Sequence, residues 1–244
     1  MSAAPSPTPN HWEIAPAMRE PLERLAILVG ELFSEQLAGL TVYGSVLSPG
    51  FDDSRMTAAT ALVVMRTNLP QLKALAGRGP TLGRMRIAAP LVLTESFIAG
   101  SADSFPLELL EIQQRRRTLL GRDCFATVVI QPEYVRLQCE REFKRMLIRM
   151  QQGLLAAAGR DDVLDDLERD IAAQLLRTLR GLLWLEGRKD FVDRQTVVDE
   201  CERLLKYSLP GVRSALQLHV EHGWADYQAL YQDVEKLAAT ADQW

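Results

Sequence analysis

The amino-acid sequence predicts an α+β fold, in which a mixed sheet with flanking helices is followed by an all-helical C-terminal bundle. Up to about residue 131, apolar runs of strand length alternate with amphipathic segments of helical period. After Pro132 every periodic segment has the helical period, and no β-branched alternation returns. With 244 residues, 47% of them hydrophobic and 25% charged, the chain has ordinary globular composition. We therefore expect a flexible tail over 1–17, an α/β domain over 18–131 and a helical domain over 132–244.

The N-terminal half is predicted to begin with an amphipathic helix, because apolar residues recur at spacings of three and four from Met18 to Leu40. A short strand at 41–43 enters a Gly-Ser turn, and a loop then leads to a second strand that ends at Met65. Further elements follow from the same patterns and from cap residues. They are a helix over 69–76, a strand over 87–93, a helix capped by Thr94, a helix from Pro106 to Leu120 and a strand over 127–130.

The C-terminal half contains five periodic segments separated by glycine or proline. A helical bundle is the simplest way for them to bury their apolar faces. The predicted helices cover 132–158, 160–186, 193–207, 211–222 and 224–241.

Charge and cysteine usage exclude several classes of protein. A net charge of −4 argues against broad, charge-driven nucleic-acid binding, which needs a surplus of Lys and Arg. Cys124, Cys139 and Cys201 are an odd number without a CxxC pair, which fits neither a disulfide framework nor a zinc site and suits a reducing compartment. No stretch of about eighteen apolar residues is present, and the first ten residues lack the features of a secretory signal. We expect a cytoplasmic protein without a membrane segment.

The segment Tyr43-Gly44-Ser45 resembles the nucleotidyltransferase superfamily, the DNA polymerase β-like fold, in which a strand ends in Gly-Ser and an Asp-x-Asp pair follows on the next strand. Glycine lets the backbone approach a triphosphate, and serine adds a hydroxyl donor. Two aspartates at i and i+2 share one face of a strand, so both can bind the Mg²⁺ ions that align the reacting groups. The resemblance implies a nucleotidyltransferase-like sheet with Gly44, Ser45 and the basic residue Arg55 as vestigial nucleotide-binding positions.

The same resemblance places the two carboxylate positions on Thr57 and Ala59. Alanine has no ligand atom and a threonine hydroxyl is a neutral, weak donor, whereas Mg²⁺ prefers hard anionic oxygens. Without the ions, several kcal/mol of charge stabilisation on the transferring phosphoryl group is lost. The sequence therefore predicts degenerate metal-ligand positions and no metal, and a non-catalytic nucleotidyltransferase fold is the default interpretation.

The resemblance extends over about residues 20–155 to a group of uncharacterised bacterial nucleotidyltransferase-domain proteins. It implies a fold more strongly than a function, since fold alone does not fix activity. The segments that carry it are 89–94, 103–108, 119–121 and 136–142.

Displaced carboxylates are the first alternative. Asp52 and Asp53 in the loop, and Glu95 after the third strand, could replace the lost ligands, which would give an active nucleotidyltransferase that needs Mg²⁺ and ATP. Each also has an ordinary structural explanation. Asp is a normal turn residue, and Glu in the first turn of a helix interacts favourably with the helix dipole.

Arg213-x5-His219 is the second alternative, because its spacing resembles that of HEPN ribonucleases, helical proteins often encoded beside minimal nucleotidyltransferases. A histidine could act as acid or base and an arginine could stabilise the phosphate. The leading hypothesis remains a catalytically degenerate binding or regulatory module that needs no cofactor. Its partner would be another protein, a second copy of the chain or a nucleotide.

Overall fold

The computed structural model describes residues 12–48, 51–54, 56–158, 160–188, 193–217 and 223–241. The chain divides into two compact units. The first consists of Met1–Ala102 and Glu108–Val129, and the second of Asp103–Leu107 and Ile130–Trp244. Each unit is described by itself.

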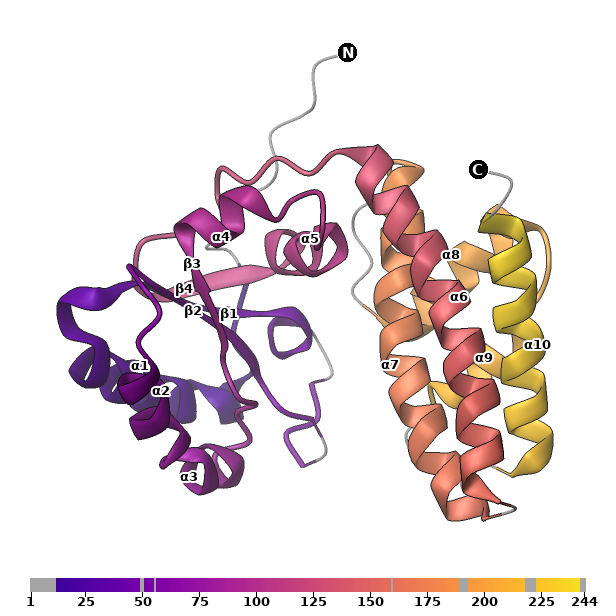
Figure 1. Ribbon diagram of the computed structural model, residues 1–244, viewed down its shortest axis with the longest axis horizontal. Helices are drawn as coiled ribbons and strands as arrows, with labels where there is room; N and C mark the ends of the chain where they lie inside the picture. Colours follow the sequence, from indigo (N-terminus) through magenta and orange to yellow (C-terminus); the bar gives the residue numbers. More distant parts are fainter. Residues whose placement is uncertain are drawn as a thin grey trace. The chain divides into compact units, whose positions relative to one another are not determined.

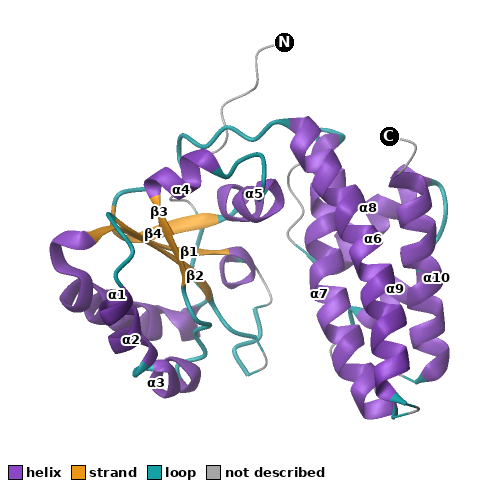
Figure 2. Cartoon of the chain, viewed as in Figure 1, coloured by secondary structure: helices purple, strands orange, loops and turns teal. Residues whose placement is uncertain are grey.

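The first unit contains a four-stranded mixed sheet (Figures 1 and 2). Its strands lie in the order β3-β2-β1-β4. The central strand β1 is antiparallel to both β2 and β4, whereas β2 and β3 are parallel. The strands are β1 (Leu37–Tyr43), β2 (Ala59–Val64), β3 (Leu91–Thr94) and β4 (Arg116–Gly121). The predicted α+β class with a mixed sheet is confirmed.

One face of the sheet is packed against α1. Successive side chains of a strand point to opposite faces, and Leu40 and Val42 of β1 join Leu62 and Val64 of β2 in one core cluster with apolar residues of α1. Thr41 and Tyr43 of β1 and Ala59 and Ala61 of β2 therefore face the other side of the sheet. The helical elements of this unit are η1 (Pro16–Met18), α1 (Arg19–Phe33), η2 (Ser34–Gln36), η3 (Gly44–Leu47), α2 (Leu69–Ala76), α3 (Gly79–Arg84), α4 (Glu95–Gly100) and α5 (Pro106–Gln114).

The prediction of one helix over 106–120 is wrong in its second half. The helix α5 ends at Gln114, and residues 116–121 form the strand β4. The apolar spacing there is compatible with a helix, but β1 offers an open edge with which this segment pairs, and tertiary pairing overrides local propensity. Gly121 adopts a φ of +72° and lies so close to the backbone of Ala38 that a Cβ could not be accommodated.

Other element boundaries also differ from the prediction. The first helix ends at Phe33 rather than near Gly39, and the helix α3 was not predicted. No strand forms over 127–130; instead the carbonyl of Val128 accepts a hydrogen bond from the side chain of Gln113 at 2.6 Å. This side-chain bond satisfies a backbone group that a strand neighbour would otherwise satisfy.

Part of the segment expected to be a flexible tail is packed. Ile14 and Met18 are buried, and the amide of Ala15 donates to the carbonyl of Val46 at 3.1 Å. The expectation of a loose tail is therefore wrong for residues 12–17, because apolar side chains there have a core to enter.

The second unit is the predicted helical bundle, drawn in pink to yellow in Figure 1. Its helices are α6 (Pro132–Ala157), α7 (Asp161–Leu185), α8 (Arg194–Leu205), α9 (Pro210–Ala215) and α10 (Trp224–Ala241). The predicted helix over 211–222 is shorter than expected, since α9 ends at Ala215 and residues 218–222 lie outside the described part. None of the helices in the described ranges is both long and apolar enough to cross a membrane.

Candidate functional site

The candidate site lies where β1 ends and β2 begins. Tyr43 is paired with Ala59, and Thr41 with Ala61, across the antiparallel ladder. These four residues are odd-numbered and share the face of the sheet that points away from α1. Gly44 follows Tyr43 directly and opens the 3-10 turn η3. The fold thus brings the predicted Gly-Ser turn beside the first residue of β2.

Gly44 needs to be glycine because its φ is +76°, in the left-handed region that other residues adopt at a cost. Its amide donates to the carbonyl of Arg115 at 3.0 Å, which continues the β1-β4 pairing by one residue. Within the turn, the amide of Ser48 donates to the carbonyl of Ser45 at 2.9 Å. Two of the backbone amides of this segment are therefore already engaged within the protein.

The face of β2 that carries Ala59 has no carboxylate. Thr57 is exposed and precedes the strand by two residues, Ala59 is half-buried, and Ala61 is fully buried. A register in which the ligand positions were Ala59 and Ala61 would place two methyl groups there, so the outcome does not depend on the choice of register. A Mg²⁺ pair needs anionic oxygens, and these residues do not supply them.

The loop acids are placed as turn residues. Asp52 accepts hydrogen bonds from the amide of Ser54 at 3.0 Å and from its hydroxyl at 2.5 Å. This arrangement is the usual Asx turn. Asp53 is exposed, and Arg55 lies outside the described residues.

Glu95 is placed at the other end of the sheet. The parallel pairing of Val64 with Thr94 puts Glu95 beside the last residue of β2, whereas Ala59 is its first. Five residues of strand correspond to about 16 Å. Glu95 instead forms an ion pair with Arg122 at 2.5 Å. The structure does not bring the predicted candidate acids together, and within the ranges it describes no group of three or more His, Cys, Asp or Glu is arranged to hold a metal ion.

Glu111 of α5 lies beside the turn, and sequence reasoning missed it. Its Oε1 lies 3.7 Å from the point where Gly44 would carry a Cβ. The sequence contains no signal for this approach, because the two residues are far apart in the chain and the extent of the helix that carries Glu111 was predicted incorrectly. Arg116 of β4 is the ladder partner of Tyr43.

Arg115, which precedes β4, and Arg116, the first residue of β4, are engaged in structural contacts. Arg116 is buried and donates to both carboxylate oxygens of Asp123, at 3.0 and 3.1 Å. Arg115 lies over the ring of Trp12 at 5.4 Å and donates to the hydroxyl of Ser48. These contacts fix the N-terminal segment and the turn, and they direct the Arg115 guanidinium toward Trp12 and Ser48.

In the second unit, Arg213 connects α9 to α8. It forms ion pairs with Asp199 at 2.8 Å and with Glu202 at 2.6 Å, and the hydrogen bonds to these carboxylates raise its pKa. His219, the other member of the predicted ribonuclease pair, lies outside the described residues.

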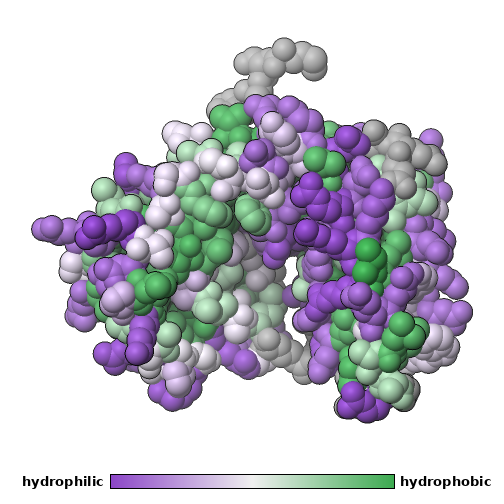
Figure 3. All heavy atoms as spheres, viewed as in Figure 1, coloured by the Kyte–Doolittle hydropathy of each residue, from purple (hydrophilic) through white to green (hydrophobic). Residues whose placement is uncertain are grey.

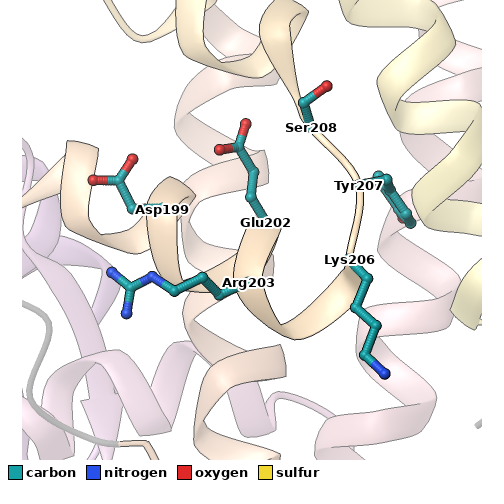
Figure 4. A pocket seen from close by; sticks show the side chains of 6 residues that line it. All are labelled: Asp199, Glu202, Arg203, Lys206, Tyr207 and Ser208. Carbon is teal, nitrogen blue, oxygen red and sulfur yellow. The ribbon is translucent and has the colours of Figure 1, made fainter.

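A shallow pocket of about 590 Å³ adjoins Arg213, lined by Asp199, Glu202, Arg203, Lys206, Tyr207 and Ser208. Figure 4 shows that the side chains of Glu202 and Lys206 point in opposite directions. The charged groups of this pocket do not converge on one point, as they would in a site that binds a single reacting group.

No protein-family model matches the chain, and no curated protein matches its sequence. Among solved structures, it is similar to the spectinomycin adenyltransferase AAD(9) from Enterococcus faecialis, whose crystal structure contains ATP and spectinomycin. The match has a TM-score of 0.57 at 11% sequence identity, and it covers 91% of this chain and 98% of that chain. The chain has a nucleotidyltransferase-like fold. At this identity the likeness shows the fold alone, and the resemblance to the uncharacterised bacterial group stays a prediction.

Proposed function

We propose that this protein is a catalytically degenerate member of the nucleotidyltransferase-like fold and that it acts by binding rather than by nucleotidyl transfer. The observation that supports this proposal is the start of β2, where Thr57 just before the strand and Ala59 and Ala61 within it stand instead of paired carboxylates. Metal ions contribute several kcal/mol to phosphoryl transfer by neutralising developing charge, and each 1.4 kcal/mol corresponds to about a tenfold change in rate. A site that cannot hold the ions loses several orders of magnitude in rate.

A stripe of exposed apolar residues on α6 supports a role in protein binding. Its members are Tyr134, Leu137, Ile148 and Leu155, which are 38, 44, 54 and 81% exposed. Their spacings of three, eleven and seven residues place them on one side of the helix. Figure 3 shows hydrophobic spots scattered within the mainly hydrophilic surface of the helical unit. The partner that we propose is another protein or a second copy of the chain.

The catalytic part of the proposal is tested by titration calorimetry with ATP, with and without Mg²⁺, together with an assay for pyrophosphate release. We expect no Mg²⁺-dependent binding and no release. Metal-dependent binding that is lost in Asp52→Asn or Asp53→Asn, but not in Asp103→Asn, would establish the active alternative instead. Asp103 is a matched control because it also accepts a hydrogen bond from the serine that follows it.

Ribonuclease activity is not proposed, because Arg213 is held between two carboxylates. A guanidinium in that position is neutralised and is already donating its hydrogen bonds. Metal-independent hydrolysis of an RNA pool that disappears in His219→Ala would overturn this conclusion.

A further inference from the structure

The first unit contains a cavity of about 490 Å³ between α1 and β4, which is an edge strand of the sheet. Arg117 of β4 lines this cavity and is paired with Val42 across the antiparallel ladder. Directly opposed residues point to the same face of a sheet, and Val42 belongs to the core cluster that α1 covers. The cavity therefore lies on the α1 face, whereas Tyr43 and Ala59 beside the Gly44-Ser45 turn lie on the other face.

The buried part of the cavity wall is apolar. Ile14 and Leu22 are buried members of the core cluster, and Ala26 and Leu119 pack against that cluster. The cavity volume falls within the range of about 300 to 1,000 Å³ that is usual for small-molecule sites. An apolar group that entered the cavity would be stabilised by its removal from water. The cavity therefore suits a small ligand with an apolar body.

The outer part of the cavity wall carries charges of both signs. Glu13, Arg19 and Glu23 are exposed and Arg117 is half-buried, so that two arginines and two glutamates line one cavity. Within the described part of the chain, none of these four side chains forms an ion pair. Their formal charges sum to zero, which favours neither a polyanion such as a polyphosphate nor a polycation. A ligand that carries one charge of each sign matches this arrangement.

Arg117 is the charged residue best placed to hold a ligand group, because it is half-buried and water screens its charge less. Its Nη1 donates to the carbonyl of Trp12 at 3.3 Å, which holds the guanidinium beside the N-terminal segment. A guanidinium has five N–H donors and can bind a carboxylate through two parallel hydrogen bonds. In the described ranges this side chain uses a donor for Trp12 only. Further donors are therefore available for a carboxylate.

We propose that this cavity binds a short peptide with free ends and apolar side chains. Arg117 binds the carboxylate, Glu13 and Glu23 accept hydrogen bonds from the ammonium, and the apolar wall receives the side chains. In the described sheet β4 has a strand neighbour on one side only, which favours an extended peptide over other zwitterions because the outer backbone groups can pair with it. The site is separate from the Gly44-Ser45 turn and does not depend on whether that turn binds a nucleotide.

A ligand-observed NMR titration with leucyl-leucine tests the proposal on the full-length chain at pH 7 and low ionic strength. This probe has two charged ends and two apolar side chains. We expect saturable binding with a dissociation constant below about 1 mM. Amidation of the carboxylate or acetylation of the ammonium should each weaken binding at least about tenfold. Absence of saturable binding by the wild-type protein would overturn the proposal, as would equal affinity for the blocked and unblocked peptides.

Substitution of Arg117 tests which side chain binds the carboxylate. Arg117→Met should weaken binding of leucyl-leucine at least about tenfold, but it should not further weaken binding of the amidated peptide, because the two changes remove the same interaction. Arg24→Met is the matched control and should bind as the wild-type protein does, since Arg24 of α1 is exposed, pairs with Glu20 and does not line the cavity. An equal loss of affinity in both variants would overturn the proposal.

The ammonium end provides a second test that does not require Arg117→Met to fold. Glu23→Gln should weaken binding of leucyl-leucine but not of the acetylated peptide. Glu31→Gln, at an exposed position of α1 that does not line the cavity, is its control. Thermal unfolding checks the fold of each variant. A loss that is the same for the acetylated and the free peptide would contradict the assignment of this end.

Discussion

The two units of the molecule differ in where they carry acidic side chains. At the start of β2 in the first unit, the face beside the Gly-Ser turn carries alanine side chains and an exposed threonine. At the junction of α8, α9 and α10 in the second unit, Glu202, Asp233 and Asp199 each bind a backbone amide or a cation. The comparison sets acids that connect neighbouring helices in the second unit against the absence of acids at Thr57 and Ala59, where the resemblance to nucleotidyltransferases predicts metal ligands.

At this junction, two acidic side chains accept hydrogen bonds from backbone amides at the start of α9. Asp233 of α10 is 1% exposed and accepts the amides of Gly211 and Val212 at 2.7 and 3.2 Å. Glu202 of α8 accepts the amide of Leu209 at 2.7 Å. The first amides of a helix lack partners within the helix, so these two acids satisfy the start of α9 from neighbouring helices.

Replacement of Gly211 by alanine tests this junction, and we expect it to have the largest effect on the free energy of unfolding. A Cβ at Gly211 would clash with the backbone of Ala229 and Leu230, which cannot move aside as a flexible side chain could. We expect Gly211→Ala to lower the free energy of unfolding by about 3 kcal/mol. Urea denaturation followed by circular dichroism measures the loss. Gly223→Ala is the control, because nothing lies within 4 Å of its added Cβ; an equal loss there would contradict the explanation.

Removal of the Asp233 carboxylate is expected to have a somewhat smaller effect. Burial raises the pKa of Asp233, while its bonds to the amides of Val212 and Gly211 oppose that rise. Asp233→Ala leaves both amides without their acceptor, at a cost of about 2 kcal/mol. Asp233→Asn keeps one acceptor oxygen and should lose less in the same denaturation experiment. Equal stability of Asp233→Ala and the wild-type protein would show that α9 does not depend on this acid.

Glu168 of α7 differs from Asp233, because its burial lowers the stability of the folded protein when the carboxyl group is ionised. The side chain is 1% exposed, and burial, followed by the charges of Asp226 and Asp165, raises its pKa from 4.5 to about 7. The folded protein holds this proton more tightly than the unfolded chain, so stability is lost as the pH rises from about 4.5 through 7. We expect Glu168→Gln to raise the melting temperature at pH 8, by an amount equivalent to about 1 kcal/mol, and to flatten its pH dependence.

Thermal unfolding between pH 5 and 8 measures the effect of this substitution. Asp166→Asn is the control, since Asp166 is exposed and pairs with Arg169 in the same helix. A wild-type melting temperature that does not fall between pH 5 and 8 would contradict the assignment to Glu168.

Elements with their own strong pattern could be predicted from the sequence. The helices α6, α7, α8 and α10 agree with the predicted ranges within two residues at either end, because long amphipathic periods and flanking glycines define them locally. The segment 116–121 could not be predicted, since its conformation is decided by the edge of β1 rather than by its own residues.

The residues of the candidate site also fall into those that the sequence could predict and those that it could not. Gly44 was identified through the resemblance of Tyr43-Gly44-Ser45 to a strand that ends in Gly-Ser, and the structure adds a second reason for glycine there, a φ of +76°. Glu111 was not found, because its approach to Gly44 depends on the packing of α5. Glu95 was considered from its position in the sequence, and only the parallel register of β2 with β3 places it at the far end of the sheet.

The smallest expected effect is the most informative about the first unit. In Thr57→Asp with Ala59→Asp, one carboxylate would stand on the first residue of β2 and the other two residues before it, which an extended backbone would place on the same side, beside Gly44. We expect weak Mn²⁺ binding, with a dissociation constant on the order of 1 mM, because Mn²⁺ prefers such oxygen ligands but two carboxylates supply only part of its coordination shell. Electron paramagnetic resonance of free Mn²⁺ measures the gain in Mn²⁺ binding, and Thr57→Asn with Ala59→Asn controls for side-chain size.

A gain in Mn²⁺ binding by Ala59→Asp with Ala61→Asp, but not by the first pair of substitutions, would move the ligand positions by two residues. A gain in neither pair would mean that these positions do not face one pocket beside Gly44.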